Sequence, residues 1–300
     1  MTERVSFCSG AVTGLSGPTG NQDLPLLIMV PGGGSQAAAF DIPGQSFLET
    51  ASKNGFSAIA INRPGQADSK PLEINPMSDQ GIFAANADAL LTAIDEIWSR
   101  TAGSHPGVVI YGSSIGGAMS LHMAARWSQE RRGWPLLGVS VADIGQKPPQ
   151  NVVDTWRNLD NSETVDLAKY FPIFFGTVPS WTLSPPPSDA PPPELLIPRA
   201  ELQEVVGGWP REWHEVASKI IVPSQYVLAE HDSVWEVSNS LLSEFGSALE
   251  RASPYVEAKI MAHTSHGIGL GSLAKTHMLE VLAFVSRCST MRAIPEMLED

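Results

Sequence analysis

The sequence predicts an α/β protein whose central sheet is mostly parallel and flanked by helices. Continuous apolar runs of strand length recur along the first half of the chain, a pattern typical of strands buried on both faces. These runs lie at residues 24–30, 56–62, 107–111 and 136–142. Segments with apolar residues at helical spacing separate them, at residues 41–54, 79–100 and 115–129. Because a strand–helix–strand unit joins parallel strands through a right-handed crossover, the alternation indicates a parallel sheet.

The composition is that of an ordinary globular protein, and it argues against several functional classes. Hydrophobic residues make up 43% of the 300 residues and charged residues 17%, which is enough for a substantial core. The formal net charge of −13 would repel phosphate backbones and anionic lipid surfaces. Neither nucleic acid nor a membrane is therefore an expected partner.

Targeting features and cysteine usage favour a cytoplasmic protein. No apolar run approaches the length that spans a membrane, and the first residues lack the apolar core of a signal peptide. Cys8 and Cys288 lie near opposite ends of the chain, and both are expected to be free thiols in a reducing compartment. The oligomeric state is left open, with a homodimer as one arrangement that the sequence allows.

Both ends of the chain are expected to add to the sheet. The alternating run Val5-Ser6-Phe7 predicts a small edge hairpin within residues 1–24. After residue 219 the sheet is expected to resume. The later strands are predicted at residues 220–222, 225–229 and 255–261, with helices at residues 235–250 and 270–286 and a polar, frayed tail at residues 287–300.

Residues 145–219 break the alternation and are interpreted as a helical, proline-rich cap inserted after the sixth expected strand. No strand of sheet type is expected there. Short helical pieces are predicted around residues 162–170, 194–206 and 210–218. The proline run at residues 185–193 favours extended geometry, and the density of aromatic residues favours a folded cap over a disordered insert. The predicted organisation is a core of residues 1–144 and 220–300 with a cap of residues 145–219.

One stretch carries the clearest chemical signal. The apolar run at residues 108–111 leads directly into Gly112-Ser113-Ser114-Ile115-Gly116, and a helical pattern follows at once. Gly-x-Ser-x-Gly between a strand and a helix is the context of a nucleophile elbow, a tight turn that holds the serine hydroxyl clear of the backbone. The pattern alone is weak, because glycine and serine are common in turns. Its position between a strand and a helix strengthens the assignment of Ser114 as a nucleophile.

Two more reactive side chains follow predicted strands. Asp232 lies just beyond the strand at residues 225–229, and His266 lies in the loop after the strand at residues 255–261. The carboxyl ends of parallel strands share one edge of a sheet, where ligands bind. Ser114, Asp232 and His266 are therefore expected to meet in space although they lie far apart in the sequence.

The chain order of Ser114, Asp232 and His266, together with several loop motifs, resembles the α/β-hydrolase fold superfamily over roughly residues 24–286. The matching motifs are Gly112-Ser113-Ser114-Ile115-Gly116, Val30-Pro31-Gly32-Gly33-Gly34, Asn62-Arg63-Pro64-Gly65-Gln66-Ala67-Asp68-Ser69, Ala229-Glu230-His231-Asp232 and Ser265-His266-Gly267. Together they are far more specific than any one of them. One departure is that Pro31-Gly32 stands where many relatives have His-Gly, so that the usual anchor of the oxyanion loop is lost.

The resemblance implies a serine hydrolase mechanism without a metal or a cofactor. Ser114 would attack a carbonyl carbon, His266 would take and return the proton, and Asp232 would orient the imidazole. The N–H groups of Ile115 and Gly33 would hold the oxyanion, with Gly34 as the second choice after Gly33. A serine at the elbow argues against epoxide hydrolase and dehalogenase chemistry, which use an aspartate there.

Asp143 and His263 are the rival candidates for the acid and the base. Asp143 also ends a core strand, but Asp232 ends the next strand after the cap and is preferred. His263 lies nearer the end of its strand, yet the His266-Gly267 pair fits the histidine loop better. His263 and His266 have metal-ligand spacing, but no Cys, Asp or Glu in that loop completes a ligand set.

The expected activity is cleavage of an ester, thioester or lactone bond of a small hydrophobic substrate through an acyl-enzyme. The aromatic residues of the cap suggest an apolar pocket, and the candidate substrate contacts are Phe171, Phe174, Phe175, Trp181 and Trp213. Alternatives on the same fold are C–C bond hydrolysis, lyase, acyltransfer and cyclisation chemistry. A non-catalytic small-molecule receptor is an alternative from another class, since a fold does not fix a function.

Overall fold

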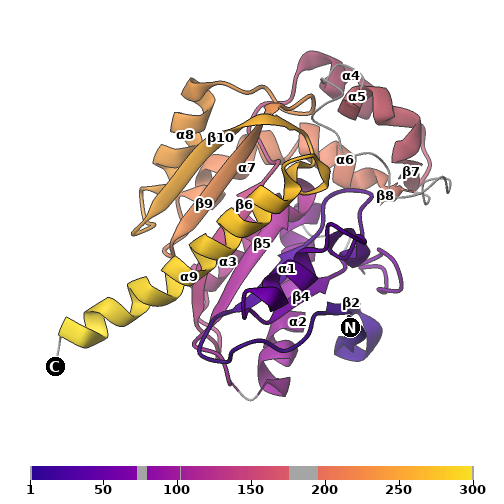
Figure 1. The fold of residues 1–300 in the computed structure, drawn as a ribbon. Helices are drawn as coiled ribbons and strands as arrows, with labels where there is room; N and C mark the ends of the chain where they lie inside the picture. The colour runs from indigo at the N-terminus through magenta and orange to yellow at the C-terminus, as the bar shows by residue number, and fades with distance from the viewer. Residues whose placement is uncertain (1, 73–79, 102, 176–194, 299–300) are drawn as a thin grey trace.

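The computed structural model describes residues 2–72, 80–101, 103–175 and 195–298 (Figure 1). The strands are β1 Glu3–Phe7, β2 Val12–Ser16, β3 Leu26–Val30, β4 Ala58–Ile61, β5 Val108–Ser113, β6 Leu136–Ala142, β7 Thr164–Asp166, β8 Leu196–Pro198, β9 Ser224–His231 and β10 Val256–Ser265. The α-helices are α1 Phe47–Lys53, α2 Ile82–Arg100, α3 Ile115–Gln129, α4 Gln150–Arg157, α5 Phe171–Phe175, α6 Arg199–Val206, α7 Trp209–Ala217, α8 Asn239–Leu249 and α9 Ala274–Leu298. Short 3₁₀ turns include η2 Ala37–Phe40 and η3 Leu167–Tyr170.

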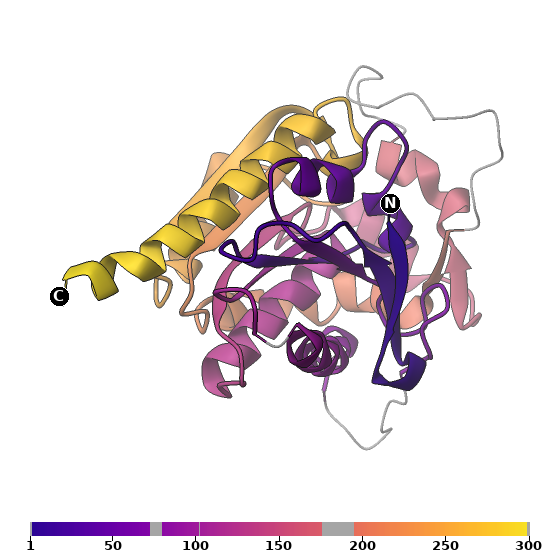
Figure 2. The ribbon, with the colours of Figure 1, turned by 60° about the horizontal axis from the view of Figure 1, so that its bottom comes forward.

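The main sheet confirms the predicted fold class. Within the described ranges it contains eight strands in the order β1-β2-β4-β3-β5-β6-β9-β10. The pairs β1–β2 and β2–β4 are antiparallel, which confirms the N-terminal hairpin, and all pairs from β4 to β10 are parallel. Figure 2 shows α1 and α9 on one face of the sheet and α2 and α3 on the opposite face. The sheet is therefore mostly parallel and covered by helices on both sides.

The central strands are apolar at every position because both of their faces are buried. Along β3, Leu26, Ile28 and Val30 belong to the core formed with α2, α3, α7 and α8. The alternate residues Leu27 and Met29 belong to the core formed with α1 and α9. This two-sided burial explains why the strands appear as continuous apolar runs in the sequence. It also holds the carboxyl ends of β5, β6, β9 and β10 rigidly at one edge.

The first predicted helix begins later than expected. Residues 41–54 were expected to be helical, but α1 starts at Phe47, where the Ser46 hydroxyl accepts a hydrogen bond from the N–H of Glu49. Pro43 and Gly44 lie inside the preceding stretch, and Gly44 has a φ of 78° that a helix cannot contain. The sequence expectation was therefore wrong for residues 41–46.

The segment between β6 and β9 is more ordered than the sequence suggested. β7 and β8 pair antiparallel as a separate two-stranded sheet, so the expectation of no strand there was wrong. The β-branched pair Thr164-Val165 favours extended backbone where a helix was expected. Figure 1 shows α4, α5, α6, β7 and β8 gathered beyond one end of the main sheet. Residues 185–193 lie outside the described residues.

The last part of this segment belongs with the helices that cover the sheet. α7 packs against α3 and α8. Trp209 on α7 is fully buried, and its indole N–H donates to the carbonyl of Gly145. The division into core and cap at residues 145 and 219 stays a prediction, and α7 is a structural part of the helical layer.

The C-terminal elements differ from the expected ones in length. β9 begins at Ser224, after the proline that ends the expected strand at residues 220–222, and β10 continues to Ser265. α8 begins at Asn239, where Ser238 caps it, rather than near residue 235. α9 runs on to Leu298, so the expectation of a frayed tail from residue 287 was wrong.

The two cysteines and the lengths of the helices bear on two smaller expectations. Cys8 and Cys288 are both free thiols, as predicted. In the part of the chain that the structure describes, no helix is both long and apolar enough to cross a membrane.

Candidate active site

Ser114 occupies a strained turn between β5 and α3. Its backbone has φ 53° and ψ −125°, a conformation that a non-glycine residue rarely adopts. Two close approaches make the turn this tight. A Cβ on Gly112 would lie 2.3 Å from the Gly116 carbonyl oxygen, and one on Gly116 would lie 2.4 Å from the Pro31 carbonyl oxygen. Both glycines of the Gly-x-Ser-x-Gly pattern are therefore required by backbone contacts.

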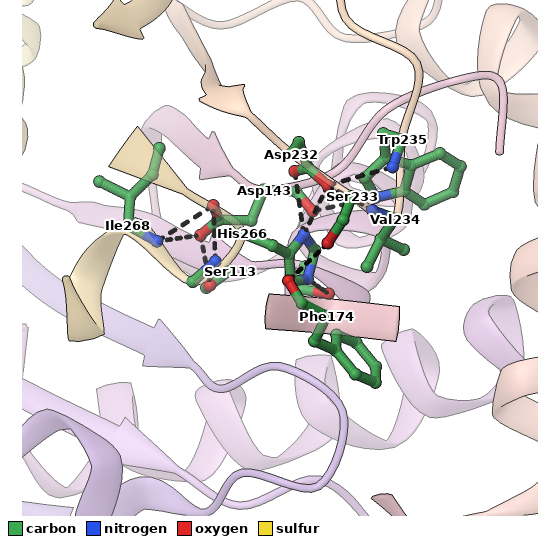
Figure 3. Close-up of polar contacts among 11 residues, drawn as sticks. Ser113, Asp143, Phe174, Asp232, Ser233, Val234, Trp235, His266 and Ile268 are labelled. Atoms are coloured by element: carbon green, nitrogen blue, oxygen red, sulfur yellow. Dashed lines mark hydrogen bonds and ion pairs between the residues drawn. The ribbon is translucent and has the colours of Figure 1, made fainter. Parts of the chain in front are cut away.

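The structure brings Ser114, His266 and Asp232 into one chain of hydrogen bonds. The Ser114 hydroxyl lies 3.1 Å from Nε2 of His266 and can donate to it. The opposite ring nitrogen, Nδ1, lies 2.9 Å and 3.0 Å from the two carboxylate oxygens of Asp232. Figure 3 shows the Asp232 carboxylate facing the His266 ring. With Nδ1 protonated, Nε2 is left as an acceptor beside the serine hydroxyl.

Backbone groups hold Asp232 in place. Oδ1 of Asp232 accepts from the N–H groups of Val234 at 2.8 Å and Trp235 at 3.0 Å. The side chain is fully buried, so these bonds replace the water that would otherwise solvate its charge. The carboxylate is fixed just beyond the end of β9, as the sequence predicted for this position.

The electrostatic environment raises the pKa of His266. Burial acts in the opposite direction and lowers it, but the Asp232 carboxylate, its hydrogen bond and the more distant Asp143 carboxylate together raise the pKa above its ordinary value. Since a base with a raised pKa holds a proton more readily, this arrangement favours transfer of the serine proton to Nε2.

Asp143 lies beside this chain of hydrogen bonds but has different partners. Its carboxylate accepts from the Ser113 hydroxyl at 3.0 Å and from the N–H groups of Gly267 and Ile268 at 3.1 Å (Figure 3). Complete burial raises the pKa of Asp143 to about 6, against the opposing effect of the His266 charge. Asp143 thus ties the residue before Ser114 to the loop after His266, while Asp232 contacts the imidazole itself.

The structure also separates His263 from the rest of the site. His263 lies in the irregular end of β10 with an exposed side chain, and its backbone N–H donates to Glu230. Asp143, Asp232 and His266 each bring one ligand atom within 4.8 Å of the others, a spacing that a metal ion could span. These atoms are, however, already engaged with one another or with backbone N–H groups, which is the pattern of a hydrogen-bonded acid–base pair.

A cavity of about 220 Å³ opens beside Ser114 and His266. One wall comes from the segment between β6 and β9, and a second wall comes from η2, α1, β5 and α9. The first wall contains Trp156, Leu167, Phe171, Phe174, Leu195, Ile197, Leu202 and Val205. The second contains Ala39, Phe40, Phe47, Tyr111 and Met278. Among the described residues that line this cavity, none is Lys, Arg, Asp or Glu, so the space is uncharged apart from His266.

Phe174 is an aromatic residue of this lining that lies near the imidazole. Its ring centroid lies 5.8 Å from that of His266. Its backbone carbonyl accepts a hydrogen bond from the Ser233 hydroxyl, which follows Asp232 directly (Figure 3). The cavity wall is thereby attached to the loop that carries the acid.

Of the two candidate oxyanion-loop glycines, Gly33 and Gly34, the structure places only Gly33 at the cavity. Gly33 is half-buried and lines the cavity, whereas Gly34 is buried and is not among the lining residues. A Cβ on Gly33 would lie 2.9 Å from Cδ1 of Ile115, so the two residues are immediate neighbours. Ile115 is the first residue of α3, where backbone N–H groups have no acceptor within the helix. This geometry favours Gly33 and Ile115 as the pair that faces a substrate carbonyl.

The predicted substrate contacts have mixed outcomes. Phe171 and Phe174 line the cavity. Trp213 does not, and this expectation is corrected: its ring stacks on Phe245 with centroids 5.0 Å apart, in the interface of α7 with α8. Trp181 and the side chain of Phe175 lie outside the described residues. Sequence alone gives the density of aromatic residues in a segment and not the face on which each one lies.

Several lining residues were missed. Trp156 is nearly completely buried against Phe174, with ring centroids 5.9 Å apart. Its position on the strongly amphipathic α4 was the available signal. On the other wall, Tyr111 is the last residue of the apolar run before the elbow. The sequence pattern predicted a buried strand position for it and gave no sign that it lines the cavity. Its hydroxyl lies 3.0 Å from Nε2 of His277.

The comparisons with known proteins agree with the fold class. Residues 27–279 match the Alpha/beta hydrolase family, and the chain therefore belongs to that family. It is an enzyme of the α/β-hydrolase class. Among curated proteins, none matches the chain in sequence.

Solved structures with the same fold include three hydrolases of low sequence identity. A carboxyl esterase from Bacillus coagulans has a TM-score of 0.64 at 14% identity, covering 96% of this chain and 99% of that chain. An N-acyl homoserine lactonase has a TM-score of 0.63 at 16% identity, with coverages of 97% and 99%. A monoacylglycerol lipase from Paleococcus ferrophilus has a TM-score of 0.60 at 14% identity, with coverages of 96% and 99%.

The tight turn at Ser114 leads to a prediction about stability. In Gly112→Ala the new methyl group would overlap the Gly116 carbonyl oxygen and the Ser120 hydroxyl, so the free energy of unfolding should fall by about 1–3 kcal/mol. Urea denaturation measures it. Gly133→Ala is the control, because its Cβ would meet nothing within 4 Å and should change stability by no more than about 0.5 kcal/mol. Equal stability of the two variants would contradict the packing described here.

The pKa of His266 provides a second prediction. An NMR titration of the imidazole should give a pKa above about 6.5 in the wild type and a lower pKa in Asp232→Asn, because the lowering effect of burial then outweighs the remaining raising effect of Asp143. Since folding favours the protonated ring in the wild type, its contribution to stability is present below the unfolded-state pKa and is lost as pH rises through the folded-state pKa.

Asp143→Asn is the matched control for this titration. An asparagine oxygen can still accept from Gly267 and Ile268, and Asp143 is the weakest of the influences that raise the pKa of His266. The variant should therefore lower that pKa less than Asp232→Asn does. A larger decrease in Asp143→Asn would identify Asp143 as the main acidic partner.

Proposed function

We propose that this enzyme is a serine hydrolase that cleaves an ester or lactone bond of a small, uncharged, apolar substrate. The observation that carries the proposal is the hydrogen-bonded chain from Ser114 through His266 to Asp232, which ends at an apolar cavity. A serine hydroxyl beside an imidazole that is oriented by a carboxylate is the arrangement of an activated nucleophile.

The proposed reaction proceeds through an acyl-enzyme. The Ser114 oxygen attacks the substrate carbonyl carbon while Nε2 of His266 accepts its proton. The imidazolium then donates that proton to the leaving oxygen, and the carbon–oxygen bond breaks. A water molecule, deprotonated by His266, attacks the acyl-enzyme and releases the acid and the free serine. Asp232 stabilises the imidazolium in both halves of the reaction.

The oxyanion of the tetrahedral intermediate is proposed to accept hydrogen bonds from the N–H groups of Ile115 and Gly33. The position of Ile115 at the start of α3 supports this role, because the helix dipole favours negative charge there. The exposure of Gly33 to the cavity supports it as the second donor and ranks it above Gly34.

The cavity supports an uncharged apolar substrate. Its walls are almost entirely aliphatic and aromatic, and a carboxylate placed there would lose its hydration without gaining a cationic partner. The similar solved structures include an esterase, a lipase and a lactonase, and these names also support ester or lactone chemistry.

A matched pair of substrates tests this proposal. p-Nitrophenyl butyrate should be hydrolysed with a kcat/KM at least about 100-fold higher than the p-nitrophenyl hemisuccinate of similar length, because an unpaired buried carboxylate costs several kcal/mol. Ser114→Ala should lower kcat on the butyrate by about 10⁴-fold or more. Release of nitrophenolate measures both.

The control is Ser120→Ala, a serine on α3 whose hydroxyl bonds to the Gly116 carbonyl within the core and does not line the cavity. It should retain the activity of the wild type within a few-fold. Absence of turnover by folded wild type on esters, thioesters and lactones of this size would reject the proposal and favour a different reaction in the same cavity. Equal turnover of the two substrates would reject the preference for an uncharged substrate but would leave the serine hydrolase mechanism in place.

A further inference from the structure

Arg63 and Glu201 form an ion pair in the protein interior. Nη2 of Arg63 donates to Oε2 of Glu201 at 3.0 Å, and Nε lies 3.4 Å from Oε1. The side chains are 0% and 1% exposed. Burial of two charges carries a large desolvation cost, and such pairs are weak evidence of a contribution to stability. The position of this pair therefore calls for another explanation.

The same guanidinium also holds the loop after β3. Its Nη1 donates to the Pro31 carbonyl oxygen at 2.8 Å and to the Gly32 carbonyl oxygen. Arg63 thus contacts Glu201 with one edge and two successive carbonyl groups with another. A guanidinium has five N–H groups in a rigid planar arrangement and can make all of these bonds at once.

The Pro31 carbonyl and the Gly32 N–H belong to one peptide group. The Gly32 carbonyl and the Gly33 N–H belong to the next. In a planar trans peptide the C=O and N–H bonds point in opposite directions, and the described part of the chain has no cis peptide bond. Fixing the Gly32 carbonyl toward buried Arg63 therefore directs the N–H of Gly33 to the opposite side. Gly33 lines the cavity together with Pro31 and Gly32, whereas Arg63 does not, and this supports an orientation of the Gly33 N–H away from Arg63 and toward the cavity beside Ser114.

We propose that Arg63, held by Glu201, is the positioning residue that sets the oxyanion loop so that the N–H of Gly33 faces the reacting carbonyl. This inference rests on the proposed function, because it assigns the loop a role only if an oxyanion forms at Ser114. Neither Arg63 nor Glu201 touches the substrate, and both act through the orientation of the loop.

Glu201 also connects the loop to a wall of the cavity. It lies on α6, whose Leu202 and Val205 line the cavity. β8, which leads into α6, brings Ile197 so close that a Cβ on Gly33 would lie 2.6 Å from its Cδ1. The segment that forms the apolar wall and the loop that stabilises the oxyanion are thus held in one fixed arrangement.

The test is the double substitution Arg63→Met with Glu201→Met. Two methionines of similar volume avoid leaving a lone buried charge, so the protein is expected to fold. The loss of the bonds to Pro31 and Gly32 should lower kcat on p-nitrophenyl butyrate by about 100-fold, the effect of losing one oxyanion donor, with KM changed less than about threefold.

Two inhibitors separate positioning from a general structural role. n-Butylboronic acid forms a tetrahedral adduct with a serine, whereas butyramide is a planar analogue of the substrate. The double variant should lose about 100-fold in affinity for the boronic acid and keep the affinity of the wild type for the amide. Equal loss for both ligands, or unchanged kcat, would overturn the inference.

Further controls distinguish the possible failures. Arg132→Met removes an ion pair with Asp95. Neither residue lines the cavity, so the variant should lower stability without changing kcat.

If the double variant does not fold, Arg63→Lys replaces it, since one ammonium cannot bond both carbonyls and Glu201 in the same geometry. Its kcat should fall about tenfold or more with KM maintained, and an unchanged kcat would overturn the inference. Wild type that neither hydrolyses the ester nor binds the boronic acid would instead reject the proposed function.

Discussion

The structure depends on one backbone constraint, the turn that places Ser114 between β5 and α3. A residue with φ 53° and ψ −125° is stable only when its surroundings fix it, and here a strand buried from Val108 to Gly112 and a 15-residue helix do so. The turn projects the hydroxyl from the edge of the sheet at which β9 and β10 also end. Asp232 and His266 need only short loops to reach it. The parallel sheet thus determines both the fold and the meeting point of the reactive groups.

Backbone groups help to hold three of the buried charges in this region, those of Asp232, Asp143 and Arg63. Asp232 and Asp143 are both buried near His266, and each accepts from two N–H groups of the loop beside it. Arg63 similarly bonds two backbone carbonyls. Each charged side chain thereby fixes a loop while its own charge is satisfied. The reactive geometry and the rigidity of the loops therefore have the same physical origin.

Much of the fold and part of the site could be predicted from the sequence. Ser114 was found through the Gly-x-Ser-x-Gly motif, and Asp232 and His266 were found because each follows a predicted strand and parallel strands bring their carboxyl ends together. The cavity walls could not be derived in this way, since the orientation of Trp213 depends on α7 packing against α3 and α8. The Arg63–Glu201 pair joins residues 138 positions apart, and no local pattern in the sequence indicates such a contact. Strand ends are local features, whereas cavities and buried ion pairs are set by tertiary packing.

The central claim is that Ser114 is an activated nucleophile, and labelling with a fluorophosphonate probe tests it most directly. Folded wild-type protein should become covalently modified, and mass spectrometry of the peptides should place the phosphonyl group on Ser114 rather than on the neighbouring Ser113. Modification should be absent in Ser114→Ala and strongly slowed in His266→Ala, since the imidazole removes the serine proton. Absence of labelling in the wild type, or labelling that persists in Ser114→Ala, would contradict the account.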